Sequence, residues 1–220
     1  MSRDSIPRPA LELCYARFLE DENTAEFIRA VSQRYTLPSL VRLITSGNYV
    51  SRRAAAFAIT FLGDYSHNGV LGEALHDPDR GVRMLADNGI RQLWRRDGNA
   101  PLQRRLAELT RMNVSSLYEE CLEAVDEFID ESPWFAEAWN QRAIARFALE
   151  QFEESANDCH QCLELNAYHF PAAVGMAHSY LEMEDPFAAL ECFRRALKIN
   201  PDLEEVRVQI NYLERTLEGK

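Results

Sequence analysis

The chain has 220 residues, of which 46% are hydrophobic and 27% charged, and a formal net charge of −11; this composition is typical of a folded globular protein and excludes a disordered one. No stretch approaches the roughly 20 apolar residues of a membrane-spanning helix, and residues 1–10 lack the apolar region of a signal peptide. Five cysteines, an odd number, argue against a secreted disulfide framework, so we expect a cytoplasmic protein without a membrane partner.

The charge divides unevenly along the chain. Residues 1–112 carry 16 Arg and 13 acidic residues, whereas residues 113–220 carry 8 basic and 22 acidic residues. Such an asymmetry indicates two modules with different surfaces. Apolar residues recur at i, i+3 and i+4, as in Ala25–Val31, which is the period of an amphipathic helix, and the alternation that marks strands is absent. We therefore predict an all-α, two-module solenoid, with modules at residues 1–100 and 101–220.

The first module repeats with a period of about 31 residues. The residues that coincide are Leu40 with Leu71, Ile44 with Leu75, Arg52 with Arg83, Ala55 with Ala86, Ala58 with Gly89 and Ile59 with Ile90. The loop at residues 75–83, followed by an Ala-rich helix, resembles the short HEAT-like repeats of bacterial proteins over residues 22–95. An acid of its Asp-Pro-Asp turn is suited to cap the next helix. We expect Arg53 and Arg83 to be structural and to pair with acids or carbonyls around Asp77 and Asp79.

A boundary is predicted at residues 97–101, which have the composition of a turn. Two arginine pairs, at residues 95–96 and 104–105, flank it close to Trp94 and suggest a nucleic-acid patch. However, the strongly acidic second module would repel a polyanion. Capping of the last helix of the first module is the favoured role, and we expect no nucleic-acid partner.

The second module repeats with a period of 34 residues, in units 136–169 and 170–203. Small residues coincide at positions 8 and 20, whereas position 24 holds Cys159 and Phe193. This pattern, clearest in Glu191–Pro201, resembles the tetratricopeptide repeat. A degenerate unit at residues 102–135, with a second helix at Tyr118–Glu131, precedes the two units, and a capping helix at 203–217 follows them. The first unit departs from the pattern by placing arginines at positions 7 and 11, which are usually apolar.

The resemblance implies a concave peptide-binding groove lined by the first helix of each unit. The candidate groove residues are Asn140, Gln141, Ile144, Phe147, Val174, His178, Leu181, Val208 and Tyr212. Repeats that clamp acidic C-termini need Lys and Asn at two groove positions of one unit and Lys and Arg at two of a later unit. Here these positions hold Asn140, Ile144, Glu205 and Gln209, with no cation among them, so a carboxylate clamp is not expected. The acids of the second helices, including Glu153, Glu154 and Asp158, are expected to form a solvated convex face.

Catalytic and metal-binding motifs have little support in this sequence. Cys159 and Cys162 are spaced as in metal and redox sites, but a structural zinc needs two further ligands, and both fall on core positions of the repeat. A packed, reduced pair is favoured. The five histidines form no metal-ligand spacing, and no residue set matches a catalytic motif or a phosphate-binding loop. We predict no catalytic residue, metal or cofactor.

The predicted function is a non-enzymatic adaptor that presents a concave surface to a protein or peptide partner. Two alternatives stay open. The first is an enzyme-associated protein, because HEAT-like repeats also occur in bilin lyases, or a chaperone of a cofactor protein. The second is a structural homo-oligomer built through the acidic second module. For the groove face itself, the alternative to peptide binding is packing against the first module or against a second copy.

Overall fold

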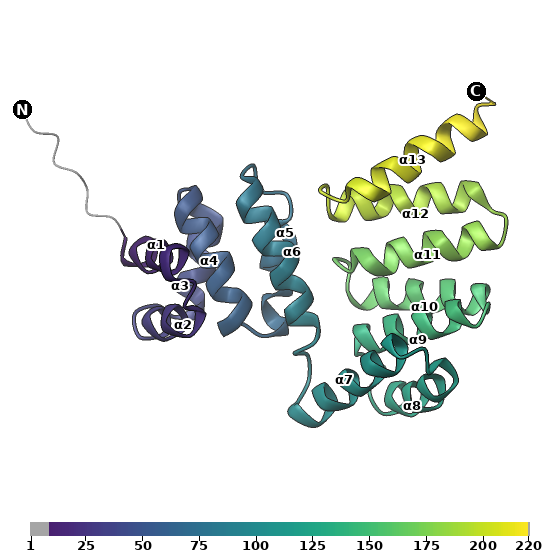
Figure 1. The fold of residues 1–220 in the computed structure, drawn as a ribbon, viewed down its shortest axis with the longest axis horizontal. Coiled ribbons are helices and arrows are strands. Elements are labelled where there is room, and N and C mark those ends of the chain that lie inside the picture. The colour runs from purple at the N-terminus through teal and green to yellow at the C-terminus, as the bar shows by residue number, and fades with distance from the viewer. Residues whose placement is uncertain (1–8, 220) are drawn as a thin grey trace, which may run out of the picture. The chain divides into compact units, whose positions relative to one another are not determined.

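The computed structural model describes residues 9–219, which form thirteen α-helices joined by short turns, with no β-strand in that range (Figure 1). The all-α prediction is confirmed. The chain divides into two compact units, Met1–Leu93 and Trp94–Lys220. The division precedes the predicted boundary at residues 97–101. None of the described helices has the length and apolar content needed to cross a membrane.

The N-terminal unit is built from helical hairpins whose buried faces follow the 31-residue period. Its elements are α1 (Ala10–Asp21), α2 (Thr24–Ser32), α3 (Leu37–Ser46), α4 (Tyr49–Leu62), the 3-10 helix η1 (Tyr65–His67), α5 (Asn68–Ala74) and α6 (Arg80–Trp94). The coinciding apolar residues Leu40 and Leu71, and likewise Ile59 and Ile90, are fully buried. The period thus marks equivalent core positions.

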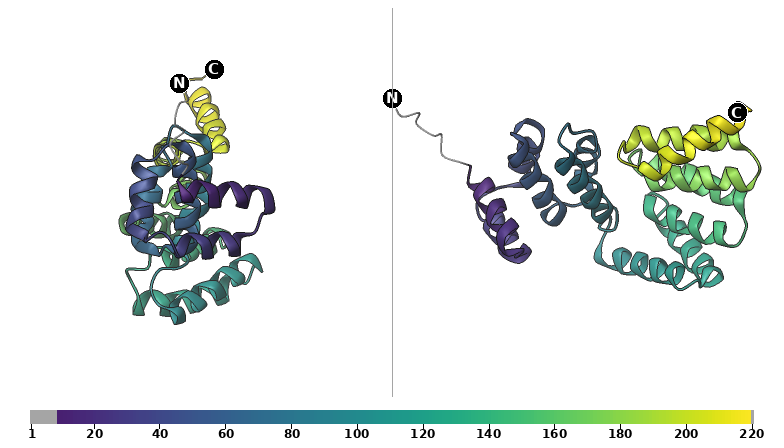
Figure 2. Two further views of the ribbon diagram at one scale, coloured as in Figure 1. Left: turned by 90° about the vertical axis from the view of Figure 1, so that its left-hand side faces the viewer. Right: turned by 45° about the horizontal axis from the view of Figure 1, so that its top comes forward.

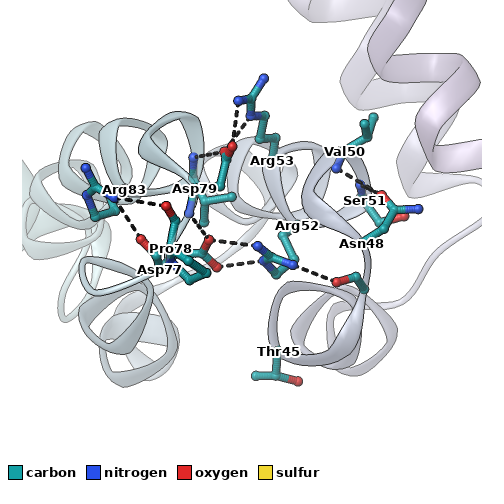
Figure 3. A network of polar contacts seen from close by, with 12 residues as sticks. Thr45, Asn48, Val50, Ser51, Arg52, Arg53, Asp77, Pro78, Asp79 and Arg83 are labelled. Atoms are coloured by element: carbon teal, nitrogen blue, oxygen red, sulfur yellow. Dashed lines mark hydrogen bonds and ion pairs between the residues drawn. The ribbon is translucent and has the colours of Figure 1, made fainter.

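The loop before α6 is held by arginines from α4 and α6, as Figure 3 shows. Arg53 donates two hydrogen bonds to the Asp79 carboxylate, at 2.6 and 2.7 Å, and Arg83 donates to the Asp77 carbonyl at 3.0 Å. Arg52 makes a second bidentate pair, at 2.7 and 2.9 Å, with the Asp77 carboxylate. The structural roles predicted for Arg53 and Arg83 are confirmed, and Arg52 adds a pairing that was not predicted.

Asp79 has two roles in this loop, and its replacement by alanine tests both. Its carboxylate accepts the Val82 N–H at 3.0 Å, which caps α6, and it pairs with Arg53. Loss of a cap and of a partly exposed ion pair together is expected to lower the free energy of unfolding by about 1–2 kcal/mol, as measured by urea denaturation. Replacement of Asp87, which pairs with Arg91 one turn away on α6, should cost less than about 0.5 kcal/mol. Equal effects would contradict the capping role.

The C-terminal unit is a stack of antiparallel helices in which each helix packs beside the next (Figure 1, Figure 2). Its helices are α7 (Ala100–Val114), α8 (Tyr118–Glu131), α9 (Ala136–Ala148), α10 (Phe152–Leu165), α11 (Phe170–Glu182), α12 (Pro186–Ile199) and α13 (Glu204–Leu217). α8 has the bounds predicted for the second helix of the degenerate unit. α13 lies where the capping helix is predicted, and it buries Val206, Ile210 and Leu213.

The backbone of the C-terminal unit repeats as its sequence does. Ser116, Glu150 and Glu184 stand 34 residues apart in the turns that follow α7, α9 and α11, and they have φ angles of 58°, 61° and 59°. Left-handed backbone is uncommon for residues other than glycine, so three occurrences in register identify one turn used three times. The degenerate unit therefore shares the geometry of the two regular ones, although its first helix matches the pattern poorly.

Candidate functional site

The predicted groove residues divide into a closed half and an open half. In the closed half, Asn140 and Gln141 are only 8% and 6% exposed, and their amides donate to Glu137 Oε1 at 3.1 and 2.8 Å. Asn113 of α7 donates to the side-chain oxygen of Gln141 at 2.9 Å. These groups are already engaged inside the unit. We therefore remove Asn140 and Gln141 from the candidate surface, which corrects the sequence-based list.

A buried histidine completes this polar network. His169, the residue before α11, contacts Glu137 Oε2 through Nε2 at 2.8 Å, and its Nδ1 accepts the Ala172 N–H at 3.1 Å. Because Nδ1 accepts this bond, Nε2 is the ring nitrogen that donates to Glu137. Burial alone would raise the pKa of Glu137, but the hydrogen bonds from His169, Gln141 and Asn140 hold that pKa below its usual value of 4.5.

The open half contains a pocket of about 130 Å³ formed by α9, α10 and α11. Its lining residues are Ala143, Ile144, Phe147, Ser155, Cys159, Gly175 and His178. Two aromatic contacts hold its rim: the Phe147 ring meets that of Phe152 edge-on at 5.4 Å, and the His178 ring meets that of Phe193 at 5.3 Å. The structure thus brings Ile144, Phe147 and His178 together in one pocket.

The pocket exists because two positions of the repeat carry small residues. Position 24 holds Cys159 in the first unit, where the second unit has the larger, fully buried Phe193. Gly175 in α11 has no side chain, and an added Cβ would lie 3.2 Å from the Cys159 sulfur. Glycine inside a helix costs about 1 kcal/mol relative to alanine. Neither Cys159 nor Gly175 is among the groove residues predicted from the sequence, although a cysteine at the position that holds phenylalanine in the next unit is a signal for such a pocket.

The other groove residues extend the apolar surface beyond the pocket. Val208 and Tyr212 are 60% and 63% exposed and are the only apolar side chains among the exposed residues of α13. Val174 and Leu181 are half-buried and pack against the core between α11 and its neighbours.

The inner face between α9 and α10 holds a buried ion-pair cluster. Asp158, expected on the solvated convex face, is instead buried at 2% exposure. It accepts two hydrogen bonds from Arg142, at 2.9 and 2.8 Å, and one from Arg146, at 2.8 Å. This corrects the expected position of Asp158. It also explains why arginines replace apolar residues at positions 7 and 11 of this unit, because both face the same buried carboxylate.

The histidine and the cysteine that line the pocket, and the neighbouring Cys162, are neutral near pH 7. Burial lowers the pKa of His178, and the nearby Glu182 carboxylate offsets only part of this effect. Burial raises the pKa of Cys159 to about 12 and raises that of Cys162 as well. A thiol that does not ionise is a poor nucleophile. Cys159 and Cys162 are buried, free thiols, as the packed-pair interpretation predicted.

Comparisons with known proteins agree with this geometry. Residues 171–203 match the tetratricopeptide repeat family. The chain is 28% identical, over 143 residues, to a TPR repeat-containing protein of Rhizobium etli. The aligned region covers 65% of this chain and 69% of that protein. Among solved structures, the first TPR of Spaghetti (RPAP3) bound to an HSP90 peptide has a TM-score of 0.51 at 18% identity, covering 53% of this chain and 93% of that one. The first TPR domain of human RPAP3 has a TM-score of 0.50 at 18% identity, covering 54% and 93%. Residues 171–203 of the C-terminal unit thus match the tetratricopeptide repeat family, and the chain shares its helical-repeat fold with solved tetratricopeptide domains.

Proposed function

We propose that the chain is a non-enzymatic adaptor that binds a protein partner through the open half of the groove. The observation that carries the proposal is the apolar surface on the first helices, where the 130 Å³ pocket adjoins exposed Ile144, and α13 adds exposed Val208 and Tyr212. A concave apolar site with a few polar groups is the usual form of a ligand site. Such binding requires no catalytic group, metal or cofactor.

The proposed ligand differs from that of the structurally similar Spaghetti domain, which is bound to an HSP90 peptide of sequence SRMEEVD. An acidic C-terminus needs cations in the groove. Here the equivalent positions hold Asn140, Ile144, Glu205 and Gln209, and the first of these is buried within the internal network. We therefore propose a partner segment that is not an acidic C-terminus.

For the N-terminal unit we propose HEAT-like repeats that act as a second recognition or spacing element, in a cytoplasmic protein. Its paired apolar core positions and arginine-held loop support this proposal. We assign no nucleic-acid role to the arginines near residue 100, since Arg105 pairs with Glu131 and lies 5.1 Å over the Phe128 ring. A homo-oligomer formed through the groove, or an enzyme-associated role, is the alternative.

Single charged substitutions on the exposed groove residues test the adaptor role. Ile144→Glu and Tyr212→Glu should each weaken binding of the purified partner by roughly 30-fold, or about 2 kcal/mol, because each places a charge in an apolar contact. The two residues are 43% and 63% exposed, so the free energy of unfolding should change little. The partner is first identified by cross-linking in native extract, and its affinity for each variant is then measured by calorimetry.

Phe187→Glu is the matched control. Phe187 lies on α12, a second helix, and is 68% exposed, so the substitution makes the same chemical change away from the groove. It should leave partner affinity unchanged. A partner that binds all three variants as tightly as wild type would contradict a groove site, and recovery of self-associated chain alone would favour the homo-oligomer.

A further inference from the structure

The pocket has the size and lining to take one aliphatic side chain. Its volume of about 130 Å³ is near the roughly 150 Å³ at which an apolar cavity lined by aliphatic and aromatic groups binds benzene. Ala143, Ile144 and Phe147 supply carbon surface. A leucine-like side chain suits this space, whereas a charged group would lose its hydration there without gaining a partner.

The polar atoms at the pocket leave one group free to bind a peptide. Ser155 Oγ donates to the Ala143 carbonyl at 2.9 Å and receives the Ser179 hydroxyl at 3.1 Å, so its hydrogen bonds are made. The ring nitrogens of His178, by contrast, have no hydrogen-bond partner within residues 9–219. A neutral imidazole offers one donor and one acceptor, which matches the alternating groups of a peptide backbone.

The rim of the pocket is negatively charged. Glu150 lies two residues beyond the end of α9, and its N–H donates to the carbonyl of the lining residue Phe147 at 3.1 Å. The carboxylate of Glu182 acts electrostatically on His178, another lining residue. Both glutamates are exposed. Between residues 113 and 193 the only arginines or lysines are Arg142 and Arg146, and both are bound to the buried Asp158. No cation of these helices is left to neutralise the rim.

We propose that the pocket binds a short extended segment of the partner in which a leucine-like side chain enters the pocket and an adjacent lysine or arginine meets Glu150 or Glu182. This proposal rests on the proposed adaptor function and adds the chemical class of its ligand. Apolar contact then supplies the anchor, and charge complementarity selects the partner and speeds its association.

Synthetic peptides with blocked termini test the proposal on the full-length protein. Each peptide carries a central leucine flanked on both sides by lysines, serines or glutamates, and binding is followed by fluorescence anisotropy. The lysine-flanked peptide should bind at least about tenfold more tightly than the glutamate-flanked one, and the difference should shrink as salt is added. Replacement of the central leucine by serine should remove most of the affinity.

Two sets of variants assign the effects to the pocket and its rim. Gly175→Ala narrows the pocket while favouring the helix, and it should weaken binding of the leucine peptide about tenfold but leave the weak binding of the serine peptide unchanged. Glu150→Lys combined with Glu182→Lys should reverse the preference between lysine and glutamate flanks. The control, Glu123→Lys with Glu127→Lys, makes the same charge change on exposed positions of α8 and should keep the wild-type preference.

Failure of this proposal is distinguishable from failure of the adaptor function. Equal or tighter binding of the glutamate-flanked peptide, or indifference to the central residue, would overturn the basic, leucine-bearing ligand. Absence of binding by every peptide would overturn it as well. In each case the Ile144→Glu and Tyr212→Glu measurements with the purified partner decide separately whether the groove is a protein-binding site.

Discussion

Replacing Asp158 with alanine is expected to lower the free energy of unfolding by about 3–5 kcal/mol, because it leaves two guanidinium groups facing an unoccupied buried site. The side chain of Asp158 is 3% exposed, and those of Arg142 and Arg146 are 14% and 22% exposed. The three residues join α9 to α10, which form the first regular repeat. Loss of the carboxylate removes three charge-assisted hydrogen bonds at once.

Asp126→Ala provides a matched control in the same cluster. Asp126 also contacts Arg142, at 2.6 Å, but its side chain is 56% exposed, so its removal should cost less than about 1 kcal/mol. The stability of both variants is measured by urea denaturation, followed by circular dichroism. If the dependence of the unfolding free energy on urea concentration is unchanged, the substitutions leave the unfolded state unaltered. If Asp126→Ala and Asp158→Ala lowered the free energy of unfolding equally, the burial of Asp158 would have no special structural role.

The positions of the helices in the C-terminal unit could be predicted because they depend on short-range features that repeat. The 34-residue period placed a helix at Tyr118–Glu131, and α8 has those bounds. The same turn, with a left-handed residue, recurs at Ser116, Glu150 and Glu184. Local apolar spacing and turn geometry decide such elements, and both are readable from a single chain. The 31-residue period likewise marked core residues in α3 to α6.

The state of individual groove side chains could not be predicted, because it depends on partners distant in sequence. Repeat position places Asn140 and Gln141 on the concave face, but Asn113, 28 residues before Gln141, closes that region. The position of Asp158 on a second helix predicts the convex face, but ion pairs with Arg142 and Arg146 keep its carboxylate buried between α9 and α10. Arginines at two usually apolar positions were the available signal, since buried cations require a buried acid.

Replacing His169 with alanine is expected to cost about 3–5 kcal/mol, because the variant leaves the Glu137 carboxylate buried without its strongest donor. His169 is fully buried and Glu137 is 9% exposed. The substitution also removes the cap on the Ala172 N–H at the start of α11. Three elements meet at this network, so its loss should weaken the packing of α9 and α11 together.

The pH dependence of the stability lost in His169→Ala distinguishes an effect on the buried Glu137 carboxylate from a simple loss of packing. In the wild type, the lowered pKa of Glu137 contributes stability that is present above pH 4.5 and is lost as the pH falls below it. In His169→Ala, burial is left as the main influence and raises the pKa of Glu137, so the variant gains relative stability as the pH falls. The difference between the two proteins should therefore be larger at pH 7 than at pH 4. A destabilisation that does not depend on pH would show that the imidazole acts only by filling space. A double-mutant cycle with Glu137→Ala gives a second test. If His169 and Glu137 act as a unit, their coupling free energy should be about 1–3 kcal/mol.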